Sequence, residues 1–193
     1  LSLLGGALAI YAVKGSPLPL IAGRIFFAAT ITIFLTAIPL AIVDENIFLF
    51  LIAIFSFYLA FAGWRFARNV YGRPAAIDLL AVLLMLSSGL GMWALAWIFY
   101  QTENSHYVVM VLFGVIALAL GITDLLSFQS GKVVGSKRVT RHLTNMLGAM
   151  IAVITAFLVV NVELGPSAPS WLIWVLPTAL VTPYIVLWNI RLR

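Results

Sequence analysis

The sequence contains no cysteine, and charged side chains are scarce in it. The absence of cysteine excludes disulfides, thiolate metal sites and cysteine-bound iron–sulfur clusters, and it leaves the redox compartment open. Charged residues make up 9% of the 193 residues, whereas a soluble domain has about 25%. The chain therefore lacks the polar surface that a water-soluble globular protein needs.

Apolar residues make up most of the chain and occur in long runs. The hydrophobic share is 64% and the mean hydropathy is +1.15. Runs of roughly 18 or more apolar residues are typical of membrane-spanning helices. Residues 47–63 and 108–121 are apolar on both faces, unlike the alternating strands of a membrane barrel. We predict an all-α polytopic transmembrane bundle, a single domain over residues 1–193, with about seven spans at 1–13, 20–43, 47–66, 75–100, 107–128, 142–162 and 171–189.

The first of these runs is short. As a helix, residues 1–13 would rise only about 20 Å, against a hydrocarbon core of about 30 Å. We therefore expect further residues before Leu1 and a truncated first span. A signal peptide is the alternative, but no basic segment precedes the run and no small-x-small cleavage motif precedes Lys14.

The connectors between the runs alternate in charge. All eleven Lys and Arg residues fall on one side of the predicted membrane, and four of the six acids fall on the other. Cytoplasmic loops carry the excess of Lys and Arg in membrane proteins. We predict that the N-terminus lies outside and the C-terminus inside.

A net charge of +5 would also suit a nucleic-acid-binding protein. Cytoplasmic loop cations account for this charge without nucleic acid, so we expect no nucleic-acid partner. Residues 129–141 form the only connector that offers room for a ligand. We expect its cations to contact anionic lipid head groups, namely Lys132, Lys137 and Arg138. Its GKVVGSK run at 131–137 is one residue short of a phosphate-binding loop and follows a membrane helix, so we read it as a false match.

Ionisable residues inside spans are costly and usually face a partner or a cavity. Asp78 and Asp124 lie about one turn from the cytoplasmic ends of two predicted spans, and His142 opens another at the same depth. We predict a polar pocket that opens to the cytoplasm and holds a ligand or a proton, formed by Asp78, Asp124, His142, Asn145, Arg24, Arg65 and Arg141. Structural pairing between helices is the alternative for the two carboxylates, and Asp78 also suits the positive end of a helix dipole.

One further pattern concerns helix packing. Thr144, Gly148, Ala152 and Ala156 recur at every fourth residue. Such stripes of small residues are typical of helices that approach each other closely in membranes.

The cofactor stays undetermined. The two histidines, His106 and His142, are predicted to lie on opposite sides, which disfavours haem bound by a histidine pair. Retinal is disfavoured because residues 171–189 contain no lysine. A catalytic zinc ion needs about three protein ligands and a water. His142, Asp78 and Asp124 would supply three, but two carboxylates with one histidine is an unusual set, and we assign no metal ligand.

Four pieces of the sequence look familiar together: KGSPL…AGRIFF at 14–27, FSFYLAFAGWR at 55–65, RHLTNMLGAMIAVITAFLVVN at 141–161 and WVLPT at 174–178. With them the chain resembles, over most of its length, an uncharacterised group of small bacterial polytopic membrane proteins related to a prokaryotic domain of unknown function. The resemblance implies a multi-pass protein of the bacterial inner membrane. It carries over four matching positions, His142, Asn145, Arg24 and Arg65. The group commonly has a histidine and a basic residue after GSPL, where this chain has Pro19 and Leu20, so the group's histidine chemistry is not expected at those positions.

Three functions remain open from the sequence. The first is a small-molecule or ion carrier, or a ligand-binding membrane protein, with the cytoplasm-facing pocket. The second is a non-catalytic accessory subunit that packs against other membrane protein subunits. The third is a metal-dependent membrane hydrolase.

Overall fold

The chain is all-α in the computed structural model, which describes residues 1–12, 17–165 and 168–191. The described residues form seven helices, α1 (Ser2–Tyr11), α2 (Leu18–Val43), α3 (Ile47–Arg68), α4 (Ala76–Gln101), α5 (Tyr107–Gln129), α6 (Gly135–Asn161) and α7 (Leu172–Arg191). Six of them, α2 to α7, are long and apolar enough to cross a membrane, which confirms the predicted helical membrane architecture.

Helix α1 is the exception. It has 10 residues, and at the usual helical rise it is about 15 Å long, half of a hydrocarbon core. Residue 13, the last of the predicted first span, lies outside the described residues. The span at residues 1–13, and with it the total of seven spans, therefore stays a prediction.

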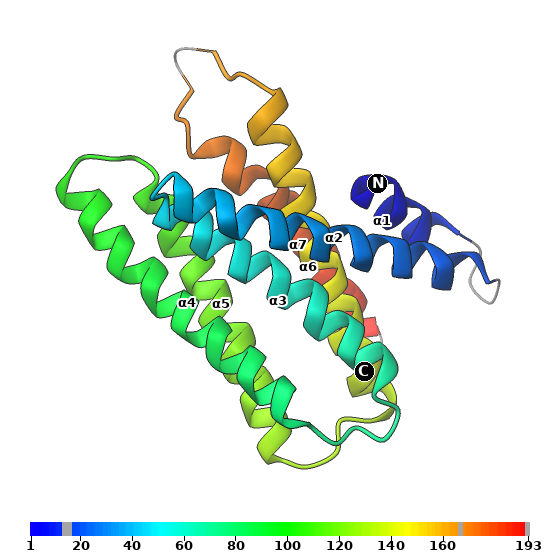
Figure 1. Cartoon of the computed structure of the whole chain (residues 1–193). Coiled ribbons are helices and arrows are strands. Elements are labelled where there is room, and N and C mark those ends of the chain that lie inside the picture. Colours follow the sequence, from blue (N-terminus) through cyan, green and yellow to red (C-terminus); the bar gives the residue numbers. More distant parts are fainter. Residues whose placement is uncertain (13–16, 166–167, 192–193) are drawn as a thin grey trace.

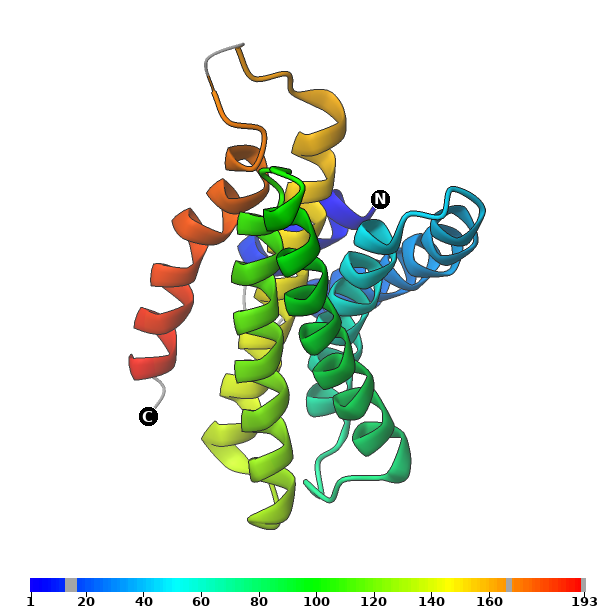
Figure 2. The ribbon, with the colours of Figure 1, turned by 90° about the vertical axis from the view of Figure 1, so that its left-hand side faces the viewer.

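Helix α3 lies at the centre of the bundle, because it packs against α2, α4 and α6. The most extensive helix pair is α4 with α5, while α7 packs mainly against α6. Helix α2 crosses the others obliquely, with α1 alongside it (Figure 1). Figure 2 shows α4, α5, α6 and α7 running lengthwise through the molecule.

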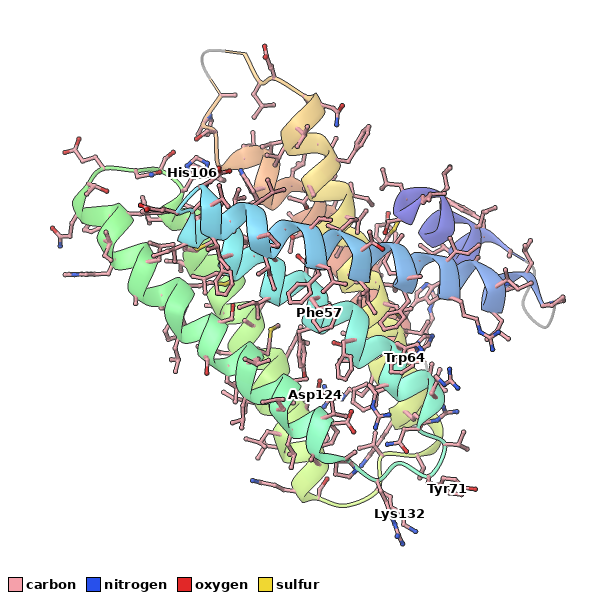
Figure 3. The ribbon with its side chains drawn as sticks, in the orientation of Figure 1. Phe57, Trp64, Tyr71, His106, Asp124 and Lys132 are labelled. Atoms are coloured by element: carbon pink, nitrogen blue, oxygen red, sulfur yellow. The ribbon has the colours of Figure 1, made fainter. Side chains whose placement is uncertain are left out.

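Aromatic rings fill the contact between α2 and α3. Phe27 stacks on Trp64 with ring centroids 4.9 Å apart, and Phe34 stacks on Phe57 at 4.1 Å. Such pairs add to the stabilisation that burial provides. This contact fixes α2 to the central helix, and Figure 3 shows Phe57 and Trp64 along α3.

Helix α6 begins seven residues earlier than predicted. It starts at Gly135 rather than at His142, so more than half of the predicted 129–141 connector is helical. Lysine and arginine are good helix formers, and their charge marks the edge of a membrane span without ending the helix. The prediction of a long connector with room for a ligand was wrong.

The two basic loops, 69–75 and 130–134, are joined to each other. The backbone N–H of Val133 donates to the carbonyl oxygen of Gly72 at 3.1 Å. Gly72 has a φ of +70°, and a Cβ there would lie 2.6 Å from the Val133 oxygen. Figure 3 shows Tyr71 and Lys132 together at this end and His106 at the other. We call the end with loops 69–75 and 130–134 the basic end, and the end with Glu103 and His106 the acidic end.

Candidate functional site

A buried carboxylate, Asp124, lies between α3, α5 and α6 near the basic end (Figure 3). Its side chain is 1% exposed. The Tyr58 hydroxyl of α3 donates to Asp124 Oδ2 at 2.6 Å, and Arg141 Nη1 of α6 lies 3.2 Å from Asp124 Oδ1. The arginine contact is an ion pair without an aligned hydrogen bond, so Oδ1 accepts no hydrogen bond from the described residues.

Arg141 is held from several directions. Its Nη2 donates to the Ser127 hydroxyl at 2.9 Å and to the Thr123 carbonyl oxygen at 3.1 Å, both on α5. Asn145, one turn along α6, is fully buried and donates from Nδ2 to the Arg141 carbonyl oxygen at 2.9 Å. The Asn145 Oδ1 atom also has no partner in the described chain. We call Tyr58, Asp124, Arg141 and Asn145 the Asp124 cluster.

Asp78 and Arg65 form a second, separate pair. Arg65 donates from Nε to Asp78 Oδ1 at 2.6 Å and from Nη2 to Oδ2 at 2.7 Å. The backbone N–H of Ala75 also donates to Asp78 Oδ2, at 2.8 Å. Asp78 lies in the first turn of α4, where a carboxylate is favoured by the helix dipole. Both of its oxygens are bonded, so the pair fixes the start of α4 against the end of α3.

A small cavity connects the two carboxylates. It measures about 20 Å³, and its wall includes Tyr58, Arg65, Asn69, Asp78 and Asp124. A cavity of roughly 10–15 Å³ already admits one water molecule when polar groups line it. The cavity is a water-sized space that runs from Asp124 toward the basic end, and of the residues predicted to form the polar pocket only Arg65, Asp78 and Asp124 line it.

His142 does not join either carboxylate. Its Nδ1 lies 2.8 Å from the carbonyl oxygen of Gly63, and a carbonyl only accepts, so Nδ1 carries the hydrogen. The contact ties α6 to α3. Among the residues that the structure describes, no three His, Asp or Glu side chains come together in a group that could hold a metal ion.

The other predicted cations have different surroundings. Arg24 lies on an exposed part of α2 and makes no hydrogen bond or ion pair within the described chain, so it is not brought to the pocket. Arg138 donates from Nη1 to the carbonyl oxygens of Phe66 and Ala67, at 2.9 and 2.8 Å. It therefore caps the end of α3. Lys132 and Lys137 are exposed at the basic end, and their contact with lipid head groups stays a prediction.

Tyr58 was not predicted from the sequence to be a site residue. It stands within an aromatic-rich run, where a tyrosine is usually read as packing. A buried phenol nevertheless needs a hydrogen-bond partner, and this requirement was the signal that pointed to a nearby carboxylate.

The Asp124 cluster can do one kind of chemistry with its own groups. A carboxylate with one oxygen that accepts no hydrogen bond, next to a water-sized space, can gain or lose a proton through a water molecule there. No family model, no curated protein and no solved structure matches this chain.

Proposed function

We propose that this chain is a multi-pass protein of the bacterial inner membrane that works as a small carrier or ligand-binding protein, with Asp124 exchanging a proton with the cytoplasmic side. Ionisable residues within membrane helices are functional by default when they face a cavity. Asp124 is such a residue.

One observation carries the proposal. Asp124 is almost fully buried, and its Oδ1 accepts no hydrogen bond from the described chain, although the residue lines the water-sized cavity. A carboxylate that served only to hold helices together would have both oxygens bonded, as Asp78 has. The contrast between the two acids favours exchange at Asp124 and pairing at Asp78.

Protonation would change the contacts of α6. A proton delivered by water to Asp124 Oδ1 neutralises the carboxylate and removes its attraction for Arg141. Arg141 keeps its bonds to Thr123 and Ser127 on α5, while Tyr58 keeps its bond to Oδ2. The protonated and ionised states therefore differ in how strongly α6 is held to α5, which is what a carrier needs if access is to alternate.

The orientation is part of the proposal. We infer that α2 to α7 each cross the bilayer, that α1 belongs to a further span, and that the basic end is cytoplasmic, with the N-terminus outside. The joined basic loops and the excess of Lys and Arg at that end support this orientation.

A structural role for the chain is the second candidate. The fully bonded Arg65–Asp78 pair and the Arg138 cap favour polar groups that fix helix positions, as an accessory subunit would need. The hydrolase gains no support, because Asp78, Asp124 and His142 lie in separate contacts.

Infrared difference spectra of the protein in lipid nanodiscs test the proton site. On acidification, the wild type is expected to gain a carboxylic-acid C=O band that Asp124→Asn lacks and that Asp78→Asn retains. The asparagine variant keeps the Tyr58 and Arg141 neighbours, and circular dichroism checks its fold. A spectrum of Asp124→Asn identical to the wild type would contradict proton exchange at Asp124.

A further inference from the structure

A second cavity, much larger than the first, lies between α3, α5, α6 and α7. Its volume is about 260 Å³. None of the residues that line it is charged, and most are apolar, among them Phe55, Leu59, Leu120, Ile151 and Ile185. It begins one helical turn from the Asp124 cluster, because Leu59 follows Tyr58 on α3 and Leu120 precedes Asp124 by one turn on α5.

The stripe of small residues on α6 forms one wall of this cavity. Thr144, Gly148, Ala152 and Ala156 all line it. The stripe was predicted to bring helices into close contact, and a Cβ at Gly148 would indeed lie 3.3 Å from Leu59 Cδ2 of α3. Beside this contact, the stripe borders the cavity. On the opposite side α7 packs mainly against α6, and its Thr182 and Val186 both line the cavity and are exposed. Figure 2 shows α7 beside α6, with α5 on the near side. The cavity is thus open to the outside of the helical bundle beside α7.

Thr155 lines the cavity, and its hydroxyl group makes no hydrogen bond in the described chain. It is 3% exposed, and its Oγ1 has no partner in the described chain. A threonine in a helix usually donates to the carbonyl four residues earlier, as Thr30, Thr32 and Thr36 do at 2.9 to 3.1 Å. A buried hydroxyl without a hydrogen-bond partner is unfavourable. Thr155 therefore has a hydrogen bond to offer a molecule in the cavity.

At the end of the cavity nearest the basic end, a second buried polar atom lacks a hydrogen-bond partner. Asn189 donates from Nδ2 to Thr144 Oγ1 at 2.8 Å, while its buried Oδ1 has no partner in the described residues. Helical geometry places it about 16 Å from Thr155, since eleven residues of α6 separate Thr144 from Thr155. A small occupant reaches one of the two atoms, and Thr155 is the more deeply buried.

The size and lining of the cavity define what fits. An apolar cavity of about 150 Å³ accepts benzene, so a space of about 260 Å³ suits a molecule of roughly ten non-hydrogen atoms. A charged group would be buried without a counter-charge, which is strongly unfavourable. We propose that this cavity binds a neutral, mainly aliphatic alcohol of that size from the bilayer, with its hydroxyl group hydrogen-bonded to Thr155 Oγ1.

Binding here does not depend on proton exchange at Asp124, because the acid does not line the cavity. Crosslinking measures occupancy of the cavity and not protonation of Asp124. A negative crosslinking result would therefore not contradict the proposed function, and a negative infrared result would not contradict binding in the cavity.

Photo-crosslinking with peptide mapping tests the proposal. The probe is an octanol analogue with a diazirine on its chain, added to the protein in nanodiscs, and octanol, octane and octanoate are the unlabelled competitors. We expect crosslinks on α6 and α7 around Thr155, efficient competition by octanol, weaker competition by octane and none by octanoate. Crosslinks spread over the lipid-facing side of α4, or equal competition by octane and octanol, would overturn the proposal.

Two pairs of variants make the result specific. Ala152→Leu adds bulk inside the cavity and is expected to abolish the crosslinks, while Ala94→Leu, on an exposed part of α4, keeps them. Thr155→Val removes only the hydroxyl and is expected to weaken competition by octanol about fivefold, the worth of one hydrogen bond. Its control, Thr32→Val on α2, leaves competition unchanged. Wild-type labelling of Ala152→Leu would contradict binding in this cavity.

Discussion

At the level of single residues, the contact between Arg141 and Asp124 is the more deeply buried of the two ion pairs among the described residues. Replacing one member of a buried ion pair leaves the other charge without compensation and costs about 3 kcal/mol or more. We predict that Arg141→Met lowers the free energy of unfolding by about this amount, measured by denaturant titration in mild detergent. Arg24→Met is the control, since exposed Arg24 has no ion pair among the described residues.

The double variant identifies the cause. Asp124→Asn removes the stranded charge, so Arg141→Met combined with Asp124→Asn is expected to be more stable than Arg141→Met alone. If the double variant were less stable by the sum of both single effects, the ion pair would not be the source of the loss.

His106 predicts a pH dependence at the acidic end. Its ring packs edge-on against Phe48 and Trp174, with centroids 5.5 and 6.3 Å away, and this burial lowers the pKa of His106 from its ordinary value of 6.5. The unfolded chain then binds the proton more readily than the folded one. Stability is therefore expected to be full above pH 6.5 and to fall as the pH drops through the lowered pKa.

Thermal midpoints measured between about pH 7 and pH 5 check this expectation. His106→Gln should reduce the slope of midpoint against pH, whereas Glu103→Gln, in the same loop, should retain most of it. An unchanged slope in His106→Gln would show that another group is responsible.

The sequence predicts which site residues share a depth but not which way they point. Asp78, Asp124, Arg65 and Arg141 were predicted to share one depth, because depth follows from position along a span, and the structure joins them as two separate pairs. Arg24 has a similar depth, yet the rotation of α2 leaves it exposed. The pairing of the others, and the part played by Tyr58, depend on which helices are neighbours, which hydropathy does not encode.

At the level of elements, both ends of α2, α3, α4, α5 and α7 were predicted to within about two residues, because the apolar runs set their length. The start of α6 was not, since its first two turns are cationic and amphipathic rather than apolar. The cavity between α6 and α7 was also not predictable, because a stripe of small residues permits either close contact or empty space.

The joint between the basic loops gives an element-scale prediction. Gly72 and Gly135 have similar φ values, +70° and +60°, but a Cβ would collide with the Val133 backbone only at Gly72. We predict that Gly135→Ala costs about 1 kcal/mol from its left-handed backbone alone. Gly72→Ala should cost clearly more and should expose residues 69–75 to protease. Equal losses in the two variants would mean that the loop contact adds nothing.

At the level of the whole molecule, charge and structure agree on two distinct ends. The joined loops place Arg68, Arg73, Lys132 and Lys137 at the basic end, and Glu103 and Glu163 belong to connectors at the other. The water-sized cavity extends from Asp124 toward the basic end. The proposed exchange with the cytoplasm therefore depends on which compartment the basic end faces.

Cysteine labelling in bacterial cells measures this directly, because the chain has no cysteine of its own. Single Lys137→Cys and Glu163→Cys variants report on exposed positions at the start of α6 and beyond its end. With a membrane-impermeant maleimide, Cys at position 163 is expected to react in intact cells, and Cys at position 137 only after the membrane is permeabilised. Reaction of both positions in intact cells, or of position 137 alone, would contradict the orientation and the cytoplasmic access of Asp124.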